Sequence, residues 1–309
     1  MAPMADVTDA AFRRMFAKYG KPDVTWTEFV SADGLCLAPE EGRKRLMRAF
    51  DFVESERPIV AQIFGSNPEY IEKASALVYE LGFDGVDLNM GCPDRGVEKG
   101  KAGAAMIKNP ELAKEVILAA KRGAGKMPVS VKTRLGYNKD ELEKWLPKIL
   151  EAEPALVTIH ARTRKEMSLV PARWERVKRA VEIRDEIQKD LKEKTLIAGN
   201  GDVMSFEDGL LKIKESGADG AMVGRGIFGN PWFFSNYSPS VEEKLNALVE
   251  HTKLFEKLCE YKNFAVMKKH YKAYCHGFDG AKELRIKLME AESGEEVEKI
   301  VNNFLTHNL

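Results

Sequence analysis

The stretch TLIAGNGD at residues 195–202 decides the fold, because it is a short apolar run that ends in glycines and polar side chains. A run of this length and composition predicts a buried β-strand. Similar runs recur along the chain and are separated by helical patterns, which is typical of parallel βα units. The eight runs lie at residues 2–4, 24–30, 58–64, 85–89, 129–133, 156–161, 195–199 and 220–223. They predict a (β/α)8 TIM barrel, an α/β fold.

The helices between these runs have recognisable ends. Asn-Pro at residues 67–68 and at 109–110 is each followed by Glu, so each pair predicts an N-cap with proline at the first helical position. Glycines mark helix ends because they adopt the left-handed conformation easily. We therefore expect Gly82 and Gly123 to end these two helices.

The β-runs cease after Pro239, and three or four helical patterns follow. Two of these begin with the sequence S-x-x-E, at residues 240–243 and 293–296, which predicts capping boxes. We expect two domains: the barrel at residues 1–238 and an all-helical domain at residues 239–309.

Composition excludes several classes of protein. Lys plus Arg and Asp plus Glu each number 48, so the net charge is 0 and any basic patch is local. The longest stretch without a charged residue, 226–241, contains two prolines and predicts no membrane span. The four cysteines form no disulfide or zinc pattern, so we expect a reduced cytoplasm and no metal site.

Polar residues close the predicted strands, and active sites of TIM barrels lie where the strands end. These residues are Gln62, then Asp87, Asn89 and Cys92, then Lys132 and Arg134, then His160 and Arg162, and finally the turns 199–202 and 224–226. Glycines in the last two turns let backbone N–H groups approach an anion, so we expect a phosphate-bearing ligand there.

The strand-end pattern does not name the ligand. A lysine on a barrel strand, Lys132, suits Schiff-base chemistry in a flavin-free lyase. A flavin fits the wider set: a phosphate nest, a cation beside the ring and an amide at the ring edge, for which Lys132, His160 and Gln62 are the candidates.

At these residues the sequence resembles the tRNA-dihydrouridine synthase family over nearly the whole chain. The motifs that carry the resemblance are APMA at 2–5, QIFG at 62–65, NMGCP at 89–93, VKTRLG at 131–136, HARTR at 160–164, GNGDV at 199–203, GRG at 224–226 and MKKH at 267–270.

The resemblance implies an FMN-containing barrel, reduced by NADPH, that saturates the C5–C6 bond of particular uridines in tRNA. Its implied FMN contacts are Pro3, Met4, Ala5, Gln62, Lys132, His160, Asn200, Gly201, Asp202, Gly224 and Arg225. Its implied substrate contacts are Asn89, Arg134, Arg162, Lys268, Lys269 and Lys272. Cys92 is the implied proton donor, and a thiol with an ordinary pKa of about 8.5 is protonated near neutral pH and still acidic enough for this role.

The helical tail holds a basic patch that the net charge hides. Residues 262–287 contain seven Lys or Arg and two acidic residues, a local charge of +5. On a helix, Lys268, Lys269, Lys272 and His276 share one face, and His270, Tyr271 and Tyr274 share the other. We expect the first face to contact tRNA phosphates and the second to pack.

Two departures from the family pattern carry expectations of their own. Residues 2–4 are short for a barrel strand, so we expect either a frayed seam or a natural start upstream of Met1. Glu166, Ser168 and Val170 stand where the family has Gln, an aromatic residue and Gly, and this loop is expected to overhang the mouth. The rival functions are an FMN reductase of a small pyrimidine or enone, the Lys132 lyase and an RNA-binding protein with a degenerate barrel.

Overall fold

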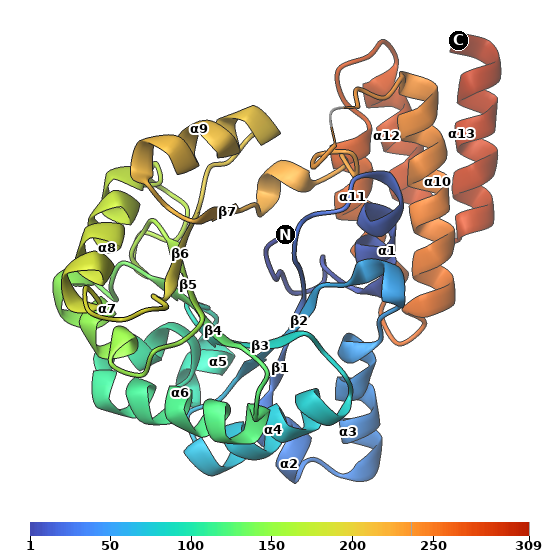
Figure 1. Cartoon of the computed structure of the whole chain (residues 1–309). Helices are drawn as coiled ribbons and strands as arrows, with labels where there is room; N and C mark the ends of the chain where they lie inside the picture. Colours follow the sequence, from blue (N-terminus) through green and yellow to red (C-terminus); the bar gives the residue numbers. More distant parts are fainter. Residues whose placement is uncertain (236, 309) are drawn as a thin grey trace.

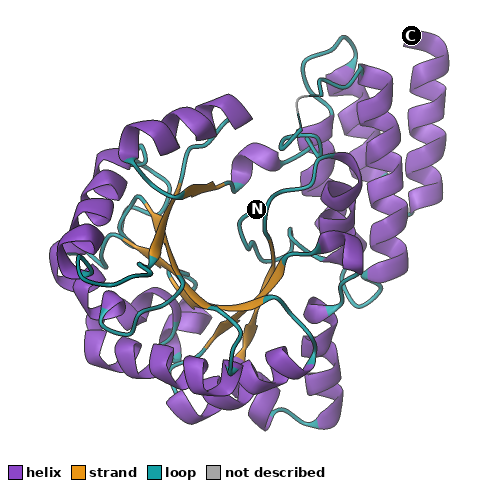
Figure 2. Ribbon diagram, in the orientation of Figure 1, coloured by secondary structure: helices purple, strands orange, loops and turns teal. Residues whose placement is uncertain are grey.

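The computed structural model describes residues 1–235 and 237–308 and contains a curved parallel sheet at its centre. Seven strands pair side by side in chain order, each with the next. They are β1 (Thr25–Ser31), β2 (Ile59–Phe64), β3 (Gly85–Met90), β4 (Val129–Arg134), β5 (Leu156–His160), β6 (Leu196–Asn200) and β7 (Gly220–Met222). Seven of the eight predicted strands are thereby confirmed. Figure 2 shows the strands curving around a central space, with helices outside.

Helices surround the sheet as the alternating pattern predicts (Figure 1). They are α1 (Ala10–Tyr19), α2 (Ala32–Leu37), α3 (Glu40–Met47), α4 (Pro68–Glu80), α5 (Arg95–Lys99), α6 (Pro110–Ala124), α7 (Leu142–Leu150), α8 (Trp174–Ile187) and α9 (Phe206–Ser216). Every residue of β3 is buried, because parallel strands are covered on both faces. Because every pair of neighbouring strands is parallel, the carboxyl ends of all seven strands lie at one rim of the sheet.

The predicted helix starts are confirmed, and one predicted end is wrong. Asn67 and Asn109 accept hydrogen bonds from the first turns of α4 and α6. Gly123, however, lies inside α6, which ends before Gly125 with its φ of 60°. A Cβ at Gly123 would stand 2.0 Å from the carbonyl oxygen of Glu72. Gly123 therefore serves the close packing of α6 on α4, and Gly125 provides the turn.

The predicted strand at residues 2–4 is not a strand. The sheet opens between β7 and β1, and the N-terminus lies in the opening (Figure 1). The Ala2 N–H donates to the Val223 carbonyl at 2.7 Å, and the Met1 amine donates to the Val24 carbonyl at 3.1 Å. Pro3 has no N–H to continue a ladder. The segment bridges the seam with these two bonds, which agrees with the expected frayed seam.

Within the described residues, four helices follow the barrel, and the first of them packs against α1. They are α10 (Val241–Leu258), α11 (Lys268–Tyr274), α12 (Ala281–Glu290) and α13 (Gly294–Asn308), with the 3₁₀ turn η5 (Phe264–Met267) before α11. The predicted S-x-x-E start at Ser240 forms a capping box with Glu243. Ala11 and Met15 of α1 share one apolar core with these helices. No helix within the described residues is both long and apolar enough to cross a membrane.

Candidate active site

A cavity of about 540 Å³ opens where β4, β5, β6 and β7 end. Eleven of the residues predicted for the site line it: Pro3, Met4, Lys132, Arg134, His160, Arg162, Asn200, Gly201, Asp202, Gly224 and Arg225. Ala5, Gln62, Asn89 and Cys92 are not among its lining residues, and neither are Lys268, Lys269 and Lys272 of the helical region. The cavity therefore brings together the predicted residues that follow β4 to β7 and those of the N-terminal segment, but not the predicted residues of β2 and β3.

Positive charge dominates the wall of the cavity. Its lining includes four cations, Lys132, Arg134, Arg162 and Arg225, and the single carboxylate of Asp202. Burial and the nearby Arg134 lower the pKa of Lys132 to about 8. Arg134 and Arg162 are buried and Lys132 is half-buried, whereas Arg225 is exposed at the rim. Buried positive charge is costly in isolation, so the cavity favours an anionic ligand.

Lys132 is held by a short chain of hydrogen bonds. Its ammonium donates to Asn200 Oδ1 at 3.2 Å, and Asn200 Nδ2 donates to the Met222 carbonyl at 2.8 Å. The second bond fixes the orientation of the amide, because its NH₂ group faces the carbonyl and its oxygen faces the lysine. Residues on β4, β6 and β7 thus act together at the cavity floor.

His160 is a neutral imidazole. Burial, followed by the charges of Arg134, Lys132, Arg162 and Arg225, holds its pKa far below the usual range. Arg162 Nη1 lies 3.2 Å from His160 Nε2. Because a guanidinium only donates, Nε2 accepts and the ring proton sits on Nδ1. His160 therefore contributes an uncharged imidazole to the cavity wall.

Arg134 and Arg162 hold loop backbones at the rim. Arg134 donates from Nε to the Gly91 carbonyl at 2.7 Å and from Nη1 to the Met167 carbonyl at 3.1 Å. Arg162 donates to Asp202 and to the Val170 carbonyl, each at 2.5 Å. Both side chains are buried, at 7% and 2% relative exposure. They shape the cavity, and their guanidinium groups already have partners within the protein.

The turn after β6 depends on a tryptophan that the sequence did not single out. Trp174 Nε1, at the start of α8, donates to the Gly201 carbonyl at 2.9 Å. The ring lies so close that a Cβ at Gly199 would stand 2.3 Å from it. Position 199 therefore requires glycine because any larger side chain would clash with the Trp174 ring. The sequence signal that could have indicated this contact is an aromatic residue at the start of the helix that precedes β6.

A buried chain of polar groups runs beneath the cavity. Asn89 Nδ2 donates to Gln62 Oε1 at 2.9 Å, Gln62 Nε2 donates to Asp87 Oδ2 at 2.6 Å, and Ser130 donates to Asp87 Oδ1 at 2.5 Å. Gln62 is fully buried, and its amide is engaged on both sides. Burial raises the pKa of Asp87 to about 6. The chain ties β2, β3 and β4 together under the ligand space.

Cys92 lies in a tight turn after β3. Asn89 Oδ1 accepts the N–H groups of Gly91 and Cys92 at 3.1 and 2.9 Å, and the Cys92 carbonyl accepts the Ala104 N–H at 2.9 Å. Burial raises the pKa of the thiol, although the positive charges of Arg134 and Lys132 oppose the shift. The half-buried thiol is therefore protonated at neutral pH.

The cationic face predicted for the tail is present on the outside of α11. Lys269 and Lys272 are exposed, Lys268 is half-buried, and His270, Tyr271 and Tyr274 are buried against the rest of the helical region. The predicted division of this helix into two faces is confirmed. The loop at 163–170 also lies as expected, because Met167 and Ser168 line the cavity.

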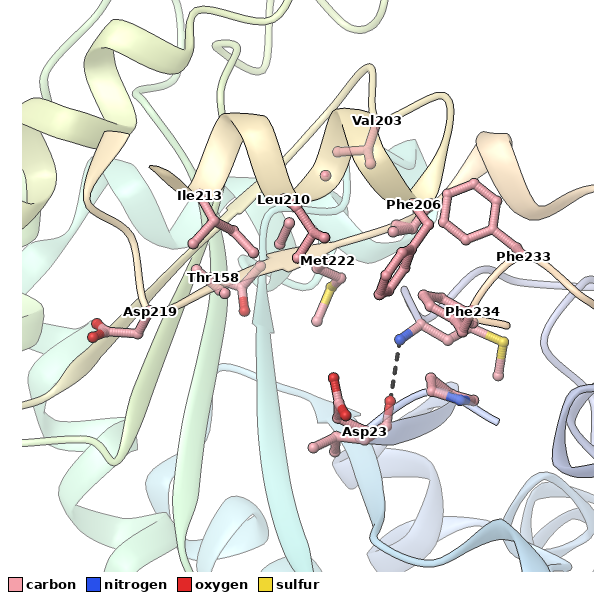
Figure 3. A pocket seen from close by; sticks show the side chains of 18 of the residues that line it. Asp23, Thr158, Val203, Phe206, Leu210, Ile213, Asp219, Met222, Phe233 and Phe234 are labelled. Carbon is pink, nitrogen blue, oxygen red and sulfur yellow. Dashed lines mark hydrogen bonds between the residues drawn. The ribbon is translucent and has the colours of Figure 1, made fainter. Parts of the chain in front are cut away.

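A second cavity, of about 330 Å³, lies at the open seam and at the opposite ends of the strands. Figure 3 shows apolar side chains of α9, among them Phe206, Leu210 and Ile213, beside it. Phe233 and Phe234 complete the apolar wall. No lysine or arginine is among its described lining residues, in contrast to the first cavity.

Fold and site together define a class: a TIM-barrel protein with a cationic ligand cavity at the carboxyl ends of its strands and a thiol beside it. The family model described as dihydrouridine synthase (Dus) matches residues 1–308, and the chain belongs to this family.

Similar proteins include "Probable tRNA-dihydrouridine synthase 2" of Bacillus subtilis (strain 168), which is 41% identical and covers 98% of this chain and 93% of its own length. "Probable tRNA-dihydrouridine synthase" of Staphylococcus aureus (strain MRSA252) is 40% identical and covers 98% of this chain and 92% of its own.

Among solved structures, morphinone reductase in complex with tetrahydroNAD is 11% identical, with a TM-score of 0.49. The match covers 75% of this chain and 84% of the reductase chain.

Proposed function

We propose that this protein is a tRNA-dihydrouridine synthase that uses FMN, reduced by NADPH, to saturate the C5–C6 bond of uridines in tRNA. The observation that carries the proposal is the cationic cavity with Cys92 on the neighbouring strand end, in a chain of the dihydrouridine synthase family. Such an activity has its substrate in the cytoplasm, where we expect the protein to work.

The residues present fit FMN. A cavity of about 540 Å³ is within the usual range for a cofactor site, and its surplus of cations suits a phosphate. The turns at 200–202 and 224–225 would hold the phosphate, and Lys132 and His160 would contact the ring. Pro3, Met4 and Ala5 would cover it from the seam. Gln62 would act one layer below, by orienting Asn89.

Reduced FMN, when bound, supplies a hydride equivalent to C6 of the uracil. Cys92 would donate its thiol proton to C5, and water would then return a proton to the thiolate, so that the substrate gains two hydrogens in all. Asn89 would hold the turn that aims the thiol, since its side chain accepts two backbone N–H groups there.

The tRNA would meet the protein at the barrel mouth and along α11. Lys268, Lys269 and Lys272 would contact phosphates, and a uridine would leave the stack to reach the cavity. Arg134 and Arg162, whose guanidinium groups hold loop carbonyls, would act on the substrate by shaping the wall it meets.

The test is reconstitution of the purified protein. It should retain FMN, oxidise NADPH and convert uridine to dihydrouridine in an unmodified tRNA transcript, while free uracil remains unchanged. Reduction of free uracil would instead favour a small-molecule reductase. A colourless protein that does not bind added FMN would favour the RNA-binding alternative. Borohydride trapping of a carbonyl compound on Lys132 would favour the lyase, for which its lowered pKa is suited.

A further inference from the structure

Lys262, between α10 and η5 of the helical region, reaches across to β1 of the barrel. Its ammonium donates to both carboxylate oxygens of Glu28 on β1 at 2.8 Å. It also lies 3.3 Å from the carboxylate of Asp6 and 3.7 Å from that of Asp9. The side chains of Lys262 and Glu28 are each only 10% exposed. A single lysine of the helical region thus joins β1 to the N-terminal segment.

The N-terminal segment at this point is a tight turn that borders the cavity. The Val7 and Thr8 N–H groups donate to the Met4 carbonyl at 3.1 and 3.0 Å, and the Met4 N–H donates to Thr8 Oγ1 at 3.0 Å. Asp6 has a φ of 54°, a conformation that costs free energy in any residue except glycine. Its N–H donates to Glu28 Oε1 at 2.6 Å. Glu28 therefore anchors the turn whose other end, at Met4, lines the cavity.

The negative charge of Glu28 is in turn neutralised by Lys262. Three carboxylates gather here, and Asp9 is almost fully buried at 1% exposure, with its other oxygen capping α1 through the Phe12 N–H. Two other cations are near: Arg13 is engaged with Glu56 and the Thr8 carbonyl, and the charge of Lys269 interacts with Asp6, Asp9 and Glu28 without a hydrogen bond to any of them among the described contacts. Without Lys262, Glu28 would lose the cation that pairs with both of its oxygens, and the more distant charge of Lys269 alone would oppose the mutual repulsion of Glu28, Asp6 and Asp9.

We propose that Lys262 is a positioning residue: by pairing with Glu28 it holds the Met4–Thr8 turn at the wall of the cofactor cavity and fastens the tRNA-facing helix to that turn. The η5 turn alone separates Lys262 from α11, which carries Lys268, Lys269 and Lys272. Lys262 and Glu28 therefore connect the surface that would bind tRNA to the wall of the cavity. The link to FMN and tRNA rests on the proposed function, whereas the link to the turn does not.

The chain offers a matched control. Lys18 on α1 pairs with Glu250 on α10 at 2.7 Å, so it too joins the barrel to the helical region. This pair is more exposed, at 57% for the lysine, and does not contact the Met4–Thr8 turn. Lys18→Met removes an ion pair between the same two parts of the molecule and leaves the turn and its anchor in place.

The experiment measures backbone hydrogen exchange over residues 4–8 and FMN affinity by flavin fluorescence, in Lys262→Met, Lys262→Arg, Glu28→Gln and Lys18→Met. We expect Lys262→Met to speed exchange of the Asp6 amide at least about tenfold while β4 keeps its wild-type protection. FMN should bind more weakly in the same variant. Lys262→Arg should restore both properties, and Lys18→Met should change neither.

Glu28→Gln keeps an oxygen for the Asp6 N–H and removes the charge that holds Lys262, so it tests the link if Lys262→Met does not fold. It should also loosen the turn. Unchanged exchange over residues 4–8 in the folded variants would overturn the proposal, and so would an equal loss of protection in Lys18→Met. If the wild-type protein binds no FMN, the proposed function fails, and the exchange data still decide the role of Lys262.

Discussion

Replacement of Cys92 by alanine should separate substrate protonation from cofactor binding. The turn around Cys92 is held by backbone groups, because Asn89 accepts its N–H and Ala104 donates to its carbonyl, both at 2.9 Å. Alanine preserves these bonds and removes only the thiol. Loss of a general acid slows a reaction by about 10²- to 10⁴-fold, which corresponds to roughly 3 to 5 kcal/mol in the barrier. Unfolding free energy should fall by no more than about 1 kcal/mol.

The assay compares the rate of dihydrouridine formation with FMN affinity and with oxidation of NADPH in single-turnover experiments. Only the rate of dihydrouridine formation should fall. Cys36→Ala is the control, since Cys36 is likewise a half-buried free thiol but lies on α2. Because burial raises the pKa of Cys92, the wild-type rate should stay level through neutral pH and fall only above the ordinary thiol pKa of about 8.5. A Cys92→Ala rate within about threefold of wild type would refute the assignment.

Three further predictions concern the cavity floor, the turn after β6 and the tail. Gly199→Ala places a Cβ 2.3 Å from the ring of Trp174, so we expect a loss of about 1 to 3 kcal/mol in thermal unfolding and weaker FMN binding, whereas an unchanged melting temperature would contradict the packing described. Asp87 has a pKa raised to about 6, so the folded state binds more protons than the unfolded state between about pH 4 and pH 6, and stability falls as pH rises through that window. Asp87→Asn should remove this fall, roughly 3 kcal/mol, in urea unfolding followed against pH, and a parallel profile in the variant would contradict the burial argument. Replacing Lys268 and Lys269 together by alanine should weaken tRNA binding and flatten the slope of log affinity against log salt by about 0.7 to 0.9 for each lost phosphate contact, and an unchanged slope would remove both residues from the interface.

The sequence predicted the barrel well because the central strands, such as β2, β3 and β4, are almost entirely buried and leave continuous apolar runs. Seven such runs became strands within a residue or two of their predicted bounds. The prediction of a strand at residues 2–4 was wrong. So short a segment pairs only if its backbone groups find hydrogen-bond partners on both sides, and Pro3 has no N–H to donate. Gly123 was misread as a helix end because its function is contact with the Glu72 carbonyl on another helix. Local sequence contains no signal for such a contact.

The site was predicted in outline for the same reason: parallel strands end at one rim, so polar residues after each run must meet. Sequence order did not reveal which of them face the cavity and which bind one another. Gln62 turned out to be held between Asn89 and Asp87, and Arg134 was found holding the Gly91 carbonyl. Trp174 was missed because its partner, the Gly201 carbonyl, lies 27 residues further along the chain, beyond α8 and β6. Lys262 was counted only as part of a basic patch, since its acidic partners lie more than 230 residues away.

The most direct test of the proposed function is to map dihydrouridine across the tRNAs of cells that lack this gene and of cells complemented with the wild-type or the Cys92→Ala protein. We predict that one or more tRNA positions lose dihydrouridine in the deletion, regain it with the wild-type protein and stay unmodified with Cys92→Ala. An identical dihydrouridine map in all the strains would contradict the account.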